Sequence, residues 1–261
     1  MTSIAQLYRS RCNGDGKPLF WIPRPVRNMP HSLFADSRRP CTEANDVVKR
    51  CIGAALVLEI PVGEFVSAQK VMPSADAVLR KLLMSNVSDE ARHLKAFEYA
   101  DEEYGSTAMP AEVLSAWEAA AQSGHPIAVA AALELGVFLC TLGVLRLVGG
   151  PSLSSLAVRV AEDEFRHVAT NTAICDALGI DLMDYWDLVY FTLETIVGCD
   201  VDIPLAGGVR LNLQWIVAQA RQLLEQREAR ELDSLTRIAV HRLPFEVGNE
   251  ELYDREPEFT R

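Results

Sequence analysis

The chain has 261 residues, 49% of them hydrophobic, which is enough for one large domain with a substantial core. Its formal net charge of −11 argues against a nucleic-acid partner, because the phosphates would be repelled by an acidic protein. The six cysteines form no Cys-x-x-Cys pair, so no iron–sulfur or rubredoxin-type site is predicted. The first twenty residues show no secretory pattern, and we expect a cytoplasmic protein with reduced thiols.

Residues 1–42 are expected to form an N-terminal arm that packs across the rest of the domain. The stretch Lys17–Pro25 is broken by prolines, yet it is too apolar for a purely disordered segment. The first fifty residues carry nine Lys or Arg against four Asp or Glu. This balance suits either a solvated arm or a docking site for an acidic carrier protein or a reductase.

Two helices are predicted next, over residues 42–70 and 74–104, and they are expected to form an antiparallel hairpin. The turn falls at Met72-Pro73-Ser74, since Pro73 resists continuing a helix and Ser74 can cap the next one. Pro61 lies inside the first predicted helix and removes a backbone hydrogen bond there. The resulting bend either widens a substrate pocket or is required by packing alone.

A long crossover with a short helix over 110–122 leads to a second predicted hairpin, made of helices over 126–148 and 151–178. Its turn is Gly149-Gly150-Pro151. Further helices are predicted over 182–197 and 208–229, and no strand pattern competes with them. The fold class is therefore all-α in one domain of 1–261, with an arm (1–42), a four-helix bundle (43–178) and C-terminal helices with a tail (179–261).

The pentapeptide Asp-Glu-x-Arg-His occurs twice, over residues 89–93 and 163–167. Each copy places a Glu and a His three residues apart, and such a pair shares one face of a helix. One copy alone would usually be a solvated pair. Two copies on separate helices match the arrangement by which a four-helix bundle holds two metal ions, which also needs one further Glu from each of the other two helices.

The distance of each Glu from its hairpin turn, counted along the helix, identifies those two carboxylates. Glu59 lies 14 residues before Pro73 and Glu90 lies 17 after it, or about 21 and 25 Å from the turn. Glu134 and Glu164 lie 16 residues before and 14 after Gly150, or about 24 and 21 Å from the second turn. Glu64 would be about two helical turns out of line. The predicted metal ligands are Glu59, Glu90, His93, Glu134, Glu164 and His167.

Glu134 also interrupts an otherwise apolar stretch over residues 127–145. Burying an unpaired carboxylate there would cost on the order of several kcal/mol. Glu134 should therefore be protonated, paired or bound to a cation. The same stretch is long enough to cross a membrane. Because the Glu sits at its middle and Arg146 closes it, we expect no membrane span.

On these motifs, residues 43–178 resemble the ferritin-like diiron carboxylate superfamily, and the Asp-Glu-x-Arg-His form looks most like its oxygenase and desaturase branches. The resemblance implies that Glu90 and Glu164 bridge two metal ions. It also implies that Asp89 and Asp163 accept from the ligating imidazoles and that Arg92 and Arg166 hold carboxylates, although ordinary surface ion pairs would look the same. Phe97 stands where ribonucleotide reductase subunits carry a Tyr, and Val160 where some N-oxygenases carry a third His.

The resemblance implies an O2-dependent non-haem diiron oxidase or oxygenase that acts on a small organic substrate by hydroxylation, N-oxygenation, desaturation or oxidative cleavage. Its cofactors would be two iron ions and O2, with electrons from a ferredoxin or a flavoprotein reductase. The chain could also form a homodimer, which the sequence does not decide. A manganese catalase with two Mn ions, a ferroxidase or iron-storage protein and a metal-free helical scaffold are the alternatives. No catalytic residue is predicted beyond the ligands. The candidate walls of a substrate pocket, which plain core packing would explain equally, are Phe65, Phe97, Val137 and Phe138.

Overall fold

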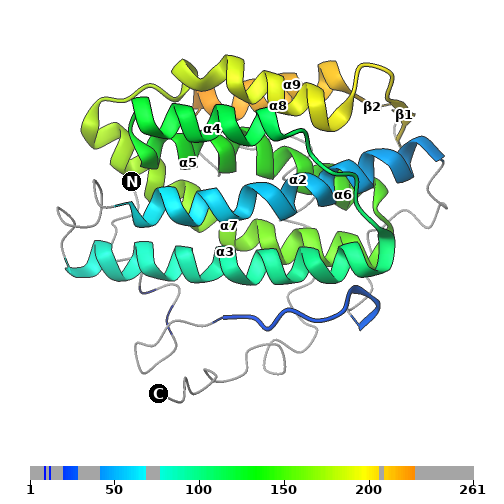
Figure 1. The fold of residues 1–261 in the computed structure, drawn as a ribbon, viewed down its shortest axis with the longest axis horizontal. Helices are drawn as coiled ribbons and strands as arrows, with labels where there is room; N and C mark the ends of the chain where they lie inside the picture. The colour runs from blue at the N-terminus through cyan, green and yellow to red at the C-terminus, as the bar shows by residue number, and fades with distance from the viewer. Residues whose placement is uncertain are drawn as a thin grey trace.

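The structure, a computed structural model, describes residues 9, 12, 20–28, 42–68, 77–205 and 209–226. It is predominantly helical, as predicted. Four long helical segments form a central bundle, in which each packs against two of the others to close a ring (Figure 1). These segments are α2 (Thr42–Ser67), α3 (Ala77–Tyr104), the consecutive helices α5 (Pro126–Leu133), η3 (Glu134–Phe138) and α6 (Leu139–Val148), and α7 (Gly150–Leu178).

The helix predicted over 126–148 is interrupted, because η3 is a single π-helical turn between two α-helices. Residues 126–146 of this segment are all buried inside the bundle. Pro126–Val148 is long and apolar enough to cross a membrane by length and composition, and it is the one such helix among the described residues. Its complete burial by neighbouring helices is the arrangement of a core helix.

Smaller elements cover the bundle on two sides. Helices α4 (Ala111–Ser123), α8 (Trp186–Val197) and α9 (Leu213–Gln226) lie above it in Figure 1, and η4 (Leu182–Tyr185) leads into α8. On the opposite side, residues 20–28 cross α3 and α7, ending in η1 (Val26–Asn28). Trp21 and Val26 are buried there, so this part of the N-terminal arm packs on the bundle as predicted.

The sequence prediction was wrong about strands. A two-stranded antiparallel sheet pairs β1 (Asp202–Pro204) with β2 (Arg210–Asn212), and Ile203 and Leu211 face each other in the core. Strands of three residues are too short to show an alternating pattern. The last predicted helix accordingly begins at Leu213 rather than Gly208, and the helix predicted from residue 182 begins with a 3-10 turn.

The first hairpin agrees with its prediction within the described residues. α2 is described to Ser67 and α3 from Ala77, while the predicted turn at Met72-Pro73-Ser74 lies outside the described residues. α2 remains one helix through Pro61. A single hydrophobic core runs from Trp21 to Leu224, joining the bundle to its covering elements.

A close backbone crossing fixes where the crossover leaves the bundle. The amide of Thr107 donates to the carbonyl of Lys49 at 3.0 Å, and a Cβ at Gly53 would overlap the Thr107 carbonyl oxygen. Gly53→Ala should therefore destabilise the metal-free protein by about 1–3 kcal/mol or more, as overpacking does. Urea unfolding would measure this loss.

Gly63→Ala in the same helix is the matched control. Its Cβ would lie 3.6 Å from the Cβ of Glu90, an ordinary contact. Since glycine in a helix interior is about 0.5–1 kcal/mol less favourable than alanine, this change should be neutral or stabilising. Equal destabilisation by both changes would contradict the crossing as the cause.

Candidate metal centre

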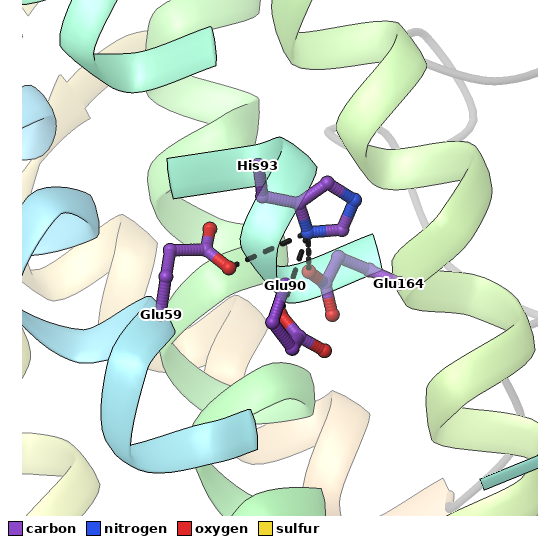
Figure 2. Close-up of side chains that lie close together, drawn as sticks. All are labelled: Glu59, Glu90, His93 and Glu164. Carbon is purple, nitrogen blue, oxygen red and sulfur yellow. Dashed lines mark ion pairs between the residues drawn. The ribbon is translucent and has the colours of Figure 1, made fainter. Parts of the chain in front are cut away.

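The structure brings all six predicted ligands together in the middle of the bundle. Each is at most 3% exposed. They form two groups, in each of which one ligand atom per residue lies within 4.8 Å of the others, and Glu90 and Glu164 belong to both groups. The first group, drawn in Figure 2, comprises Glu59, Glu90, His93 and Glu164, and the second comprises Glu90, Glu134, Glu164 and His167.

Helical geometry explains why these side chains meet. In α3 and α7 the spacing of three residues places Glu and His on the same face, and that face is turned to the core in both helices. The imidazole rings of His93 and His167 lie 5.8 Å apart between centroids. Glu59 is buried whereas Glu64 is exposed, in agreement with the choice made from depth.

The π turn begins at Glu134, one of the predicted ligands. The amide of Leu139 donates to the carbonyl of Glu134, five residues back, in place of the usual four. Gly136 within the turn packs tightly against α8, where a Cβ would come within 2.8 Å of a methyl group of Val189. Single π turns inside α-helices occur frequently at functional sites. Sequence periodicity gave no sign of this one.

The atoms that face the centre of the cluster lack hydrogen-bond partners. The ring Nδ1 atoms of both histidines come within 2.9–3.8 Å of glutamate oxygens, yet none of these contacts has hydrogen-bond geometry. Buried polar atoms without partners are costly and call for a ligand, a water or an ion. The unpartnered atoms are Glu59 Oε2, His93 Nδ1, His167 Nδ1, Glu134 Oε1 and both carboxylate oxygens of Glu90 and Glu164.

Proton affinities in the cluster reflect the crowding of acids and imidazoles. Burial raises the pKa of Glu59 and of Glu134 well above the ordinary value, and the neighbouring carboxylates raise them further. Burial alone would lower the pKa of His93 and His167, but adjacent carboxylates raise both. Burial would likewise raise the pKa of Glu90, but the two imidazoles hold it below its ordinary value. Without a cation, protons thus offset the carboxylate charges.

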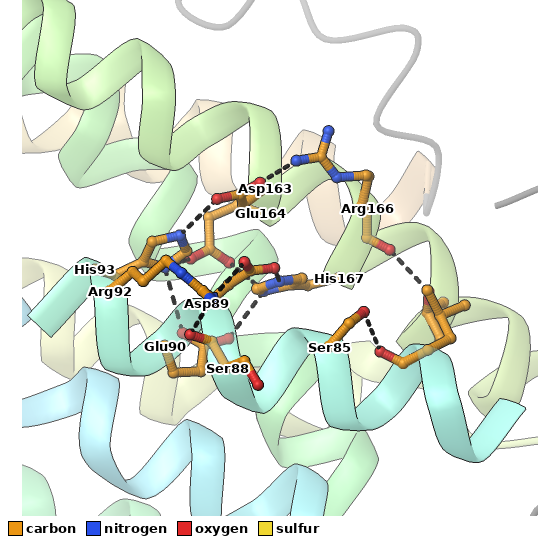
Figure 3. Close-up of polar contacts among 12 residues, drawn as sticks. Ser85, Ser88, Asp89, Glu90, Arg92, His93, Asp163, Glu164, Arg166 and His167 are labelled. Carbon is orange, nitrogen blue, oxygen red and sulfur yellow. Dashed lines mark hydrogen bonds and ion pairs between the residues drawn. The ribbon is translucent and has the colours of Figure 1, made fainter. Parts of the chain in front are cut away.

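The two motifs support each other's histidines in a crossed pattern (Figure 3). Asp163 Oδ2 lies 3.2 Å from His93 Nε2, and Asp89 Oδ2 lies 3.0 Å from His167 Nε2. A carboxylate beside Nε2 stabilises the tautomer that carries the proton there. Nδ1, the atom that faces the carboxylate cluster, is then left with the lone pair that a metal requires.

The motif arginines hold these aspartates. Arg92 donates to Asp89 at 3.3 Å, and Arg166 forms an ion pair with Asp163. Both aspartates are buried while both arginines are partly exposed, so each pair links the interior to the surface. The alternative interpretation, in which these pairs are ordinary ion pairs on the surface, does not fit because both aspartates are buried.

Three contributing residues were not identified from the sequence. The indole of Trp21 donates to Asp163 Oδ2 at 2.9 Å, and the ring of Phe20 stacks 3.5 Å from the Arg92 guanidinium carbon. The amide of Asn171 donates to Glu134 Oε2 at 2.8 Å. Asn171 could have been found, because it lies one turn after His167 on the same face of α7. Trp21 could not, since 142 residues separate it from Asp163.

The four predicted pocket residues are buried, and they follow predicted ligands on three different helical segments. Phe65 lies six residues beyond Glu59 in α2, about 9 Å along the axis. Phe97 lies seven residues beyond Glu90 in α3, about 10 Å along the axis. These displacements are opposite, because α2 and α3 are antiparallel (Figure 1). Phe65 therefore lies near the C-terminal end of α2 and Phe97 in the C-terminal third of α3, while Val137 and Phe138 belong to η3.

Comparisons with protein-family models, with curated proteins and with solved structures found no match to this chain. The chemistry of the site itself is therefore the basis for inferring a function.

Proposed function

We propose that the chain is an O2-dependent non-haem diiron oxidase or oxygenase built on a ferritin-like four-helix bundle, acting on a small organic substrate. The observation that carries this proposal is the pair of four-residue groups that share Glu90 and Glu164. Two shared carboxylates are what two adjacent metal ions need, because each bridging group balances charge on both ions. Two divalent ions carry the charge that four carboxylates neutralise.

The types of donor atom support iron or manganese. Carboxylate oxygens and imidazole nitrogens suit such ions, and the described part of the site offers no thiolate. Bound iron would supply the activation of dioxygen, and the electrons would come from an external ferredoxin or flavoprotein reductase. Hydroxylation, N-oxygenation, desaturation and oxidative cleavage all remain within this proposal.

The chain's own residues would bind and orient the ions and exclude water. Asp89 and Asp163 hold the imidazoles with Nδ1 toward the cluster. Phe65, Phe97, Val137 and Phe138 belong to the apolar core and are the candidates for a substrate wall. An apolar surrounding limits hydrolytic side reactions.

Anaerobic loading with Fe2+, followed by admission of O2, tests the proposal. We expect two iron ions per chain and a transient visible absorption band, with O2 consumed when a reductant is present. Two Mn ions with rapid peroxide breakdown would indicate a manganese catalase, and repeated uptake of many iron ions per chain would indicate a ferroxidase or storage protein. Absence of stoichiometric metal would contradict every metal function.

Metal loading should also stabilise the fold strongly. A ligand that binds only the folded chain adds about 2.7 kcal/mol per site at 100 times its Kd. At about 2–4 °C per kcal/mol for a protein of this size, two ions should raise Tm by at least about 10 °C. Carboxylic acids and imidazolium groups must lose protons to bind a metal, so the increase in Tm should become smaller as the pH is lowered from 8 to 6. Differential scanning fluorimetry with and without a chelator measures both effects.

A further inference from the structure

Glu134 is held more firmly than a ligand on an ordinary helix. Asn171 Nδ2 donates to its Oε2 at 2.8 Å, and both side chains are fully buried. Its backbone carbonyl is fixed by the π turn, and Gly136 locks that turn against Val189. Neither the backbone nor the carboxylate of Glu134 can therefore turn without breaking a contact.

The two oxygens of Glu134 have different surroundings. Oε2 accepts the amide proton of Asn171, whereas Oε1 has no hydrogen-bond partner and faces His167 Nδ1 at 3.8 Å. With Glu134 ionised, as a bound cation would keep it, the amide must present its N–H to Oε2, because a carboxylate accepts hydrogen bonds and donates none. The Oδ1 of Asn171 is buried without a partner, so the bond to Glu134 is the contact that orients this amide.

Glu59, the corresponding ligand of the first group, is not held in this way. It lies on the regular α-helix α2, with Oε2 3.4 Å from His93 Nδ1. Its Oε2 has no hydrogen-bond partner. Glu134 thus differs from Glu59 in its backbone, which begins a π turn where Glu59 lies within a regular α-helix.

We infer that Asn171 is a positioning residue that holds Glu134 as a ligand through one oxygen, Oε1, and thereby keeps a coordination position open for an exogenous ligand on the ion bound by His167. This inference rests on the proposed dinuclear metal site. A carboxylate free at both oxygens can chelate a metal and occupy that position itself. The hydrogen bond from Asn171 engages the second oxygen and opposes chelation.

Cobalt loading of the full-length protein provides the test, with azide as the exogenous ligand. Asn171→Leu removes the donor while keeping the branched shape and the number of side-chain heavy atoms. We expect it to bind two Co2+ as the wild type does, with weaker visible absorption because one ion gains a ligand atom. Azide affinity should fall by at least about tenfold, the lower end of what contacts behind a ligand contribute. A purely structural role would move neither reading.

Thr172→Val is the matched control. This neighbour on α7 is also buried and donates to the Val168 carbonyl at 2.7 Å rather than to Glu134. Its cobalt spectrum and azide affinity should equal those of the wild type. Asn171→Ser, which is too short to reach Glu134, gives a second reading if the leucine variant does not fold and should also weaken azide binding.

The outcomes separate this inference from the proposed function. If the wild type binds two Co2+ and both Asn171 variants keep its spectrum and azide affinity, the role of Asn171 is overturned and the metal site stands. An equal change in Thr172→Val would also overturn that role. If the wild type binds no stoichiometric Co2+, both the metal function and this inference fall.

Discussion

Glu164→Gln should abolish binding of both metal ions. Glu164 belongs to both ligand groups, is fully buried, and has no hydrogen-bond partner at either carboxylate oxygen. Its loss removes a ligand that both ions would share and one unit of negative charge from the site as a whole. We expect affinity to fall by more than about 100-fold, beyond the range typical of contacts behind the ligands. Metal analysis after gel filtration should find fewer than one ion per chain, and O2 consumption should fall in parallel.

Two further variants make this expectation specific. Glu59→Gln removes a ligand that belongs to one group, so it should leave one ion per chain. Glu162→Gln changes a carboxylate two positions before Glu164 that pairs with Arg159 at 3.1 Å, and it should keep two ions. Two ions retained by Glu164→Gln would show that the shared carboxylate does not bridge.

The sequence predicted the features that depend on local repetition. Helices long enough to show apolar periodicity were located, and counting residues from two turns brought Glu59 level with Glu90 and Glu134 level with Glu164. The rise per residue in a helix is constant, so approximate depth follows from arithmetic. Depth alone does not explain the first hairpin, because Gly63, four residues beyond Glu59, is the position that lies against Glu90. The helix face also decides, since it buries Glu59 and exposes Glu64. The structure brings these residues together as the count required.

Features that depend on packing between distant segments were not predictable in this way. The π turn at Glu134 is coupled to the contact between Gly136 and Val189, which come from different helices. The bond from Trp21 to Asp163 spans 142 residues. Which aspartate serves which histidine depends on the register of α3 against α7, and no pattern within one helix encodes that register.

Asp163→Asn should weaken binding of the ion on the His93 side, and Asp89→Asn should weaken binding of the ion on the His167 side. Sequence neighbourhood suggests the reverse, because Asp163 adjoins Glu164 and His167. The structure places Asp163 against His93 Nε2 and Asp89 against His167 Nε2. An asparagine can present its amide instead of a carboxylate and no longer favours the tautomer with Nδ1 free. Each change should cost about 10–100-fold in affinity for one ion.

Double variants identify which ion each aspartate supports. Glu59→Gln removes the His93-side ion and Glu134→Gln the His167-side ion. Adding Asp163→Asn to Glu59→Gln should therefore lower metal affinity little further and leave one ion per chain, because both changes act on the same metal position. Adding it to Glu134→Gln should impair both positions and leave less than one ion at limiting metal. The opposite result in the two backgrounds would contradict the crossed arrangement. If Asp163→Asn lowered metal affinity equally in the Glu59→Gln and Glu134→Gln backgrounds, Asp163 would support the whole cluster and not one histidine.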